Sequence, residues 1–228
     1  MKPAVERRRS RRHRIPAKHG ALELSLDGRV LDISVSGMSL ETHTRLNPRS
    51  RIALRLNHQL EGLAITGRVV WCFLQGTRAN AKGDQQPLYR AGIEFENVLQ
   101  PEAQRLAAFL SSRAIVTLET RLFGRFQVRG AEEVDVSSAA DFRVVGLAET
   151  SLVIEAALAI EPQPGAAVDL HFADPPISAR GRVIAYRRLR PDDDSPTELE
   201  LELLALSERD RAHLDEFRRR ALEAITGA

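Results

Sequence analysis

Short runs of alternating apolar and polar residues occur along the whole chain, and several of them recur at one fixed offset. Met38-Ser39-Leu40-Glu41-Thr42 aligns with Leu152-Val153-Ile154-Glu155-Ala156, and Gly67-Arg68-Val69-Val70 aligns with Gly181-Arg182-Val183-Ile184, both 114 residues apart. Alternation with a period of two is typical of β-strands that bury one face. Two matches at one offset indicate a tandem repeat of one β-rich domain.

The first copy contains six such runs, which predict six short strands. Leucines at positions 22, 24 and 26 mark the first run, and Asp27-Gly28 after it favours a hairpin turn. The later runs cover residues 29–35, 38–42, 51–56, 63–74 and 88–95.

The second run ends in a polar pair. If its alternation is regular, Leu31, Ile33 and Val35 share one face, and Asp32 and Ser34 project from the other. The sequence therefore predicts two adjacent polar side chains at a strand end.

A helix is expected after the strands of each copy. Pro101 favours a helix start, and Leu106 and Phe109 have the spacing of a buried stripe. In the second copy, Ser207 with Asp210 three residues later is a capping signal. We expect a mainly β fold: two tandem six-stranded antiparallel β-barrels, each followed by a C-terminal α-helix.

Positive charge is concentrated at the N-terminus. Residues 1–20 hold eight Lys or Arg and one acid, a net charge of +7, and the other 25 basic and 30 acidic residues sum to −5. Such an arm attracts a compact anion, although an arginine run alone is also typical of a solvated tail that touches nucleic acid without preference. We divide the chain into an arm (1–14), a first domain (15–113) and a second domain (114–228).

Composition excludes several classes of protein. Cys72 is the one cysteine, so no disulfide framework exists and a reducing compartment is expected. No apolar run is long enough to cross a bilayer, and no hydrophobic segment follows the arginines as in a secretory signal. The six histidines show no pair at metal-ligand spacing, and nucleophile elbows and phosphate loops are absent. We expect a soluble cytoplasmic protein that is not an enzyme and holds no metal or cofactor.

The arginine arm followed by Asp32-Ile33-Ser34-Val35-Ser36-Gly37 resembles the PilZ domain family. That family has an RxxxR motif before its first strand and a (D/N)xSxxG motif at a strand turn. The resemblance covers roughly residues 6–113 and extends to the later strands, at residues 67–71 and 90–95. It implies a bacterial receptor for cyclic di-GMP, built as a six-stranded barrel with a C-terminal helix.

The resemblance implies that the arginines and the (D/N)xSxxG residues bind the nucleotide. Arginine can grip phosphate oxygens in pairs and lie flat on a base. A carboxylate can accept hydrogen bonds from guanine, a serine can supply a hydroxyl, and a glycine lets the backbone approach the ligand. The candidate ligand-binding residues are Arg8, Arg9, Arg12, Arg14, Asp32, Ser34 and Gly37.

The sequence allows more than one assignment of the two motif arginines. Arg14 stands directly before Ile15-Pro16, where the second motif arginine is expected, but the residue four positions earlier is Ser10. The literal RxxxR spacing occurs as Arg8 to Arg12 and as Arg7 to Arg11.

The second copy lacks the (D/N)xSxxG residues, because Gly146, Ala148 and Ser151 stand in their places. Arg121 to Arg125 is an RxxxR before a strand, either a relic or chance. We expect that this domain does not bind nucleotide by itself and serves in packing, dimerisation or contact with a protein partner.

The leading hypothesis is a receptor whose arm, mobile without ligand, orders around cyclic di-GMP and changes the domain arrangement or partner binding. One alternative is a PilZ-like adaptor that acts by protein contact without nucleotide. Another is a nucleic-acid binder that uses the arm, against which stands the net acidic charge of the remaining chain.

Overall fold

The computed structural model describes residues 19–56, 63–80, 82–96, 126–127, 133–147, 151–173, 176–190 and 195–226. The strands are β1 (His19–Ile33), β2 (Gly37–Thr42), β3 (Arg51–Leu56), β4 (Leu63–Ala79), β5 (Gln85–Glu96), β6 (Phe126–Gln127), β7 (Glu133–Leu147), β8 (Ser151–Ala156), β9 (Ala167–Phe172), β10 (Ile177–Arg188) and β11 (Thr197–Ala205). The helix of this described part is α2 (Glu208–Thr226). The mainly β fold expected from the alternation is confirmed.

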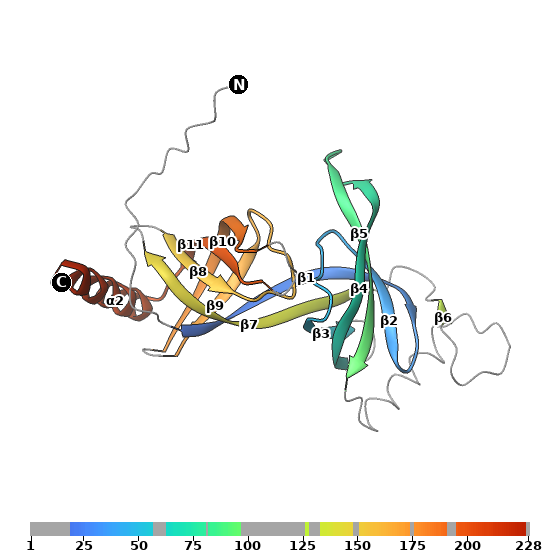
Figure 1. The fold of residues 1–228 in the computed structure, drawn as a ribbon, viewed down its shortest axis with the longest axis horizontal. Coiled ribbons are helices and arrows are strands. Elements are labelled where there is room, and N and C mark those ends of the chain that lie inside the picture. The colour runs from blue at the N-terminus through green and yellow to red at the C-terminus, as the bar shows by residue number, and fades with distance from the viewer. Residues whose placement is uncertain are drawn as a thin grey trace.

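All of these strands join one sheet. Their order is β2-β5-β4-β3-β7-β8-β11-β10-β9-β1-β6, with additional pairings of β1 to β2 and to β7. Figure 1 shows two groups of strands, with the long β1 and β7 running through both. We call the group of β2 to β6, with the ends of β1 and β7 that pair with it, the first lobe. The group of β8 to β11, with the opposite ends, is the second lobe.

The strands β1 and β7 join the two lobes. Each has 15 residues, and their bounds differ by 114 positions. They pair antiparallel from His19 opposite Arg143 to Arg29 opposite Glu133. In addition, β1 pairs with β9 of the second lobe, and β7 pairs with β3 of the first lobe. Each half of the chain therefore contributes a strand segment to the lobe of the other half.

The hairpin predicted at Asp27-Gly28 is wrong, because β1 continues through both residues. Gly28 pairs with Val134 of β7 and with Thr42 of β2, and its φ is not positive. A two-residue hairpin turn needs positive φ, whereas here β7 offers a strand partner on both sides of Asp27. The long-range pairing overrides the local turn preference, so the first two predicted strands form one continuous strand.

A second contact joins the lobes outside β1 and β7. Leu46 and Ile160, again 114 positions apart, form an isolated antiparallel bridge and are 0% and 3% exposed. The buried Asn47 side chain donates a 2.6 Å hydrogen bond to the Leu158 carbonyl and accepts one of 3.1 Å from Arg188 Nη2. Because these bonds cross between the lobes, they favour one relative arrangement.

The helix α2 begins where the capping signal predicted. Ser207 Oγ accepts a 3.0 Å hydrogen bond from the backbone N of Asp210, and Leu214 is buried against the core. The helix packs against β10. The helix predicted to start at Pro101, after the first set of strands, lies outside the described residues.

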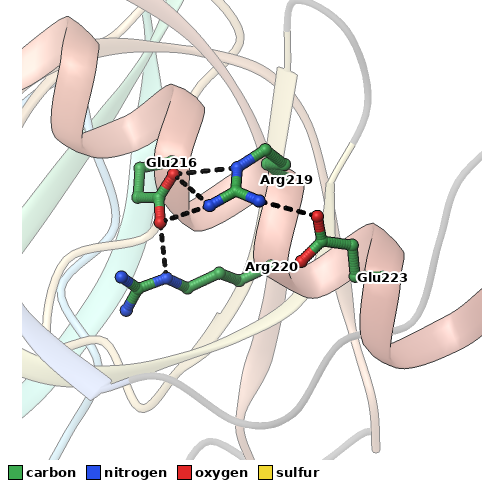
Figure 2. A network of polar contacts seen from close by, with 4 residues as sticks. All are labelled: Glu216, Arg219, Arg220 and Glu223. Atoms are coloured by element: carbon green, nitrogen blue, oxygen red, sulfur yellow. Dashed lines mark hydrogen bonds and ion pairs between the residues drawn. The ribbon is translucent and has the colours of Figure 1, made fainter. Parts of the chain in front are cut away.

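The outer side of α2 carries an ion-pair network, which Figure 2 shows. Glu216 accepts hydrogen bonds of 2.7 Å from Arg219 and Arg220, and Arg219 also binds Glu223. The hydrogen bonds from Arg219 and then Arg220 lower the pKa of the Glu216 carboxyl. Pairs at these spacings support an exposed helix, so we assign this network to helix stability.

Candidate functional site

The motif residues lie where β1 turns into β2. Asp32 lies opposite Ser39, in the second-to-last residue pair between β1 and β2. Gly37 is the first residue of β2. Ser34 lies between the two strands. The structure therefore brings these three predicted site residues together at one end of the first lobe.

Asp32 contacts two polar side chains that the sequence analysis did not identify. Ser39 Oγ donates a 2.5 Å hydrogen bond to Asp32 Oδ2. Arg90 Nη2, from β5, lies 3.3 Å from the same carboxylate oxygen and 3.4 Å from Ser39 Oγ. The side chain of Asp32 is 14% exposed and that of Arg90 is 36% exposed. The carboxylate is thus oriented by two side chains, and the Asp32 side chain as a whole is only partly exposed.

The predicted faces of residues 31–35 are wrong in part. Ile33 is buried as expected, but Leu31 is only partly buried and Val35 is 39% exposed. A β-bulge lies between Val30 and Asp32, and it shifts the alternation by one residue. Val30 and Ile33 therefore face the core, and Val35 lies beyond the end of the strand.

Ser34 organises the turn. Its side chain is buried, and its Oγ donates a 3.1 Å hydrogen bond to the Gly37 carbonyl. The same carbonyl accepts a 2.7 Å hydrogen bond from the backbone N of Ser34. The backbone N of Ser36 lies 3.3 Å from Ser34 Oγ. The hydroxyl thus holds the chain reversal that sets Asp32 against β2.

Gly37 lies where β2 and β5 approach closely. A Cβ built at this position would lie 2.2 Å from the Ile93 carbonyl oxygen on β5. Any side chain would push the two strands apart, so the structure requires glycine here for packing alone.

A second polar row lies next to Asp32 on the same strands. Arg29 Nη2 lies 2.6 Å from Glu41 Oε2, and Arg78 Nη2 lies 3.5 Å from the same oxygen. The Glu41 side chain is 8% exposed, and Arg90 lies opposite Glu41 in the register of β2 and β5. Together with Asp32, these residues place three arginines and two carboxylates on the face. Its formal charge is therefore positive, which favours the binding of an anion.

An aromatic surface on β4 borders this face. Trp71 pairs with Gly92 of β5, and a Cβ at Gly92 would lie 2.3 Å from the indole ring, so the ring covers this backbone position. Trp71 stacks on Phe73, which is 51% exposed, with 5.3 Å between ring centroids. Gly92 also pairs with Ser39. The indole therefore lies on the same side of the sheet as Asp32 and offers a planar base a stacking surface.

The short strand β6 lies on the other edge of β1. Its residues Phe126 and Gln127 pair antiparallel with Ile33 and Asp32. In Figure 1, β6 lies at the edge of the first lobe, although 29 residues of the chain separate it from β5. Segments from both halves of the chain meet at Asp32.

The predicted arm arginines, Arg8, Arg9, Arg12 and Arg14, lie outside the described residues. The place where the arm joins the fold is described: β1 begins at His19, opposite Arg143 of β7. At a rise of about 3.3 Å per residue, the path along β1 from His19 to Asp32 is about 43 Å. In Figure 1 this strand runs from the second lobe to the first. The arm thus enters the fold at the far end from Asp32.

Among the described residues of the second lobe, the polar group around Asp32 has no counterpart. Gly146, at the position 114 residues after Asp32, pairs with Val153, which stands where the first lobe has Ser39. Ser151 fills the position of Gly37, is buried, and donates a 3.3 Å hydrogen bond to Glu200. Ala148, the third predicted replacement, lies outside the described residues.

The ion pair next to the motif in the first lobe has a counterpart in the second lobe. Arg143 binds Glu155 in the second lobe at the positions of Arg29 and Glu41 in the first. Because this pair is present where the motif is lost, we assign it to strand pairing.

Other ligand sites have little support in the described part of the chain. No three His, Cys, Asp or Glu side chains among these residues could hold a metal ion together, and no helix there is long and apolar enough to span a membrane. A pocket of about 390 Å³ between β1, β3 and β7 is lined by Glu23, Asp27, Asp135 and Arg55 among others. Three carboxylates against one arginine disfavour a phosphate ligand there.

The fold and the site together define a mainly β protein with an aspartate and arginine face at a strand turn. Residues 6–112 match the model of the PilZ domain family.

No curated protein matches the sequence significantly. A comparison with solved structures finds the complex of K. pneumonia MrkH with c-di-GMP, at 8% identity, over 93% of this chain and 90% of that one. The TM-score is 0.29, and no argument rests on this likeness.

Proposed function

We propose that the protein is a non-catalytic, cytoplasmic receptor for cyclic di-GMP and that the nucleotide binds on the first-lobe face around Asp32. The observation that carries this proposal is the Asp32 carboxylate, held by Ser39 and Arg90 beside an aromatic surface within the PilZ domain. In this proposal residues 15–113 form the ligand-binding domain and 114–228 a degenerate PilZ-like one.

The chemistry of the face fits this ligand. Cyclic di-GMP carries two guanines and two phosphates. The Asp32 carboxylate can accept hydrogen bonds from the N1 and N2 donors of a guanine. Trp71 can stack on its ring, and Arg90, which is partly exposed, can donate to the O6 and N7 edge or to a phosphate.

The phosphates need further arginines, which the arm can supply only in part. An extended chain spans at most about 3.6 Å per residue, so Arg14 can lie up to about 18 Å from His19 and Arg8 up to about 40 Å. The strand path from His19 to Asp32 is about 43 Å. Within one chain, Arg8 and Arg9 therefore approach the face only with the arm fully extended along β1, and Arg12 and Arg14 fall short.

Ligand binding is proposed to change a surface rather than the angle between the lobes. The pairing of β1 with β7 and the bonds of Asn47 hold the lobes in one arrangement. A protein partner can bind the changed surface next to the face. There, Val70, Phe73 and Leu74 of β4 are 54%, 51% and 58% exposed.

A thermal-shift titration tests the proposal. A ligand that binds only the folded state raises the melting temperature by mass action. Cyclic di-GMP should raise the melting temperature of the wild type and leave that of Asp32→Ala unchanged. GTP should change the melting temperature of neither protein. An equal shift in both proteins would remove Asp32 from the site, and no shift in the wild type would contradict the function.

The exposed apolar row on β4 also supports a second candidate function, an adaptor that binds a protein partner, or a second copy of itself, without nucleotide. Its affinity for that partner would then be the same with and without cyclic di-GMP.

A further inference from the structure

We infer that two copies of the chain associate by pairing the free edges of their β4 strands, in antiparallel orientation about a two-fold axis. The free edge is the part of β4 from Val70 to Ala79, which extends beyond the pairing with β3. The inference names a protein interface and does not depend on the proposed nucleotide function.

The first ground is that this part of β4 has a strand partner on one side only. On that side β5 pairs with it as far as Ala79, which lies opposite Gln85. On the other side the pairing with β3 ends at Arg68, and Val69 makes the last backbone hydrogen bonds, to the loop before β3. Within the described part of the chain, no strand covers residues 70–79 on this side. Unpaired N–H and C=O groups along a strand edge are a template for another strand.

The second ground is the exposure of the hairpin that β4 forms with β5. All residues from Phe73 to Ala79 are exposed, so both faces of β4 are open there. Figure 1 shows this hairpin projecting from the first lobe. A two-stranded ribbon alone is only marginally stable, whereas three strands with apolar side chains to cover are stable. A second copy of β4 would supply the third strand.

The opposite edge of the hairpin is less suited to strand pairing. On β5, Pro87 has no N–H to donate, and its carbonyl oxygen already lies 3.0 Å from His43 Nδ1. Residues 70–79 of β4 contain no proline. The edge that is open to a further strand is therefore that of β4.

The charges along the edge favour a second copy as the partner. Residues 70–77 carry no charge, and the guanidinium of Arg78 lies 3.5 Å from the Glu41 carboxylate. Two identical edges can therefore meet without repulsion between like charges, and Phe73 and Leu74 of both copies share one interface. A two-fold axis makes such a contact self-complementary and closes it as a dimer.

The equivalent edge of the second lobe is shorter and charged. The pairing of β10 with β9 ends at Arg182, and β10 itself ends at Arg188. The free part of β10 is thus residues 184–188, and its last two residues are arginines. Charged side chains on an edge strand disfavour pairing with another chain. We therefore place the interface on β4 and use β10 as the control.

Sedimentation velocity of the full chain, from low micromolar to several hundred micromolar, tests the inference. The wild type should change from monomer to dimer as its concentration rises. Leu74→Lys brings two lysines together across the two-fold axis and should weaken the dimer by at least about tenfold. Ile184→Lys on β10, at a position that is 47% exposed, is the matched control and should dimerise as the wild type does.

A cysteine cross-link locates the contact independently. Residues that face each other in antiparallel strands have Cα atoms about 4.5–5.5 Å apart, which a disulfide can bridge. Residue 74 lies near the middle of the edge. In a Cys72→Ser background, Leu74→Cys should therefore give a disulfide-linked dimer under mild oxidation, and Ile184→Cys should not.

A folded wild type that stays monomeric over the whole concentration range would overturn the inference. So would a dimer that the two lysine variants weaken equally or not at all, or equal cross-linking of the two cysteine variants. No nucleotide is present in these measurements, so failure of the interface is distinct from failure of the proposed function.

Discussion

Asp32 and Ser39 face each other across β1 and β2, and Ser39 Oγ donates a 2.5 Å hydrogen bond to Asp32 Oδ2. Ser39 is fully buried, whereas the side chain of Asp32 is 14% exposed. The buried hydroxyl therefore orients the carboxylate at this strand turn.

Replacing Ser39 by alanine should weaken nucleotide binding without abolishing it. A hydrogen bond to a charged group contributes about 1.5–3 kcal/mol, and Arg90 still contacts Asp32 in the variant. We expect a loss of about tenfold or more in calorimetric titration. Ser25→Ala, at an exposed position of β1, is the control. An unchanged affinity in Ser39→Ala would show that this bond does not orient the site.

Replacing Gly37 by alanine should destabilise the fold before it affects the ligand. Its Cβ would lie 2.2 Å from the Ile93 carbonyl, and forced overpacking costs about 1–3 kcal/mol. The free energy of unfolding from urea titrations should fall by that amount. Gly76→Ala is the matched control, because a Cβ at Gly76 meets no described atom within 4 Å. Equal stability of the two variants would contradict the close approach of β2 and β5.

Replacing Trp71 by alanine should weaken cyclic di-GMP binding by about tenfold or more, since stacking of a base on an aromatic ring contributes about 1–3 kcal/mol. Fluorescence reports the same contact directly, because Trp71 is the single tryptophan of the chain. Tyr186→Ala, an exposed aromatic residue of the second lobe, should bind normally. Tryptophan emission that does not respond to saturating nucleotide would place the ligand elsewhere.

Replacing Asn47 by alanine should destabilise both lobes together. The variant loses the hydrogen bonds of a buried side chain to Leu158 and Arg188, at about 1–3 kcal/mol. Because the lobes share β1 and β7, unfolding should remain one cooperative transition at a lower midpoint. Two separate calorimetric transitions would show that the lobes unfold independently.

The strands and the second helix could be predicted from the sequence because they depend on local patterns. Alternation places Leu22, Leu24 and Ile33 in the core, and Ser207 caps α2. The hairpin at Asp27-Gly28 was predicted wrongly for the same reason: the local signal is strong, but a strand partner more than 100 residues away determines the result.

The neighbours of Asp32 could not be predicted from local sequence. Ser39, Arg90 and Trp71 reach this face through the pairing of β2, β5 and β4, and their alternation alone does not show which strands are adjacent. The β-bulge after Val30 also changes which residues face outward, and nothing in the composition of that run indicates it. The motif could be located from the sequence, whereas the face around it depends on strand order.

The central claim is that the first lobe binds cyclic di-GMP, and calorimetric titration of the full wild-type chain tests it most directly. Saturable binding of cyclic di-GMP with a dissociation constant in the micromolar range or tighter is predicted, with no binding of GTP under the same conditions. Absence of a binding signal for cyclic di-GMP at several hundred micromolar, with protein shown to be folded by its cooperative melting, would contradict the account.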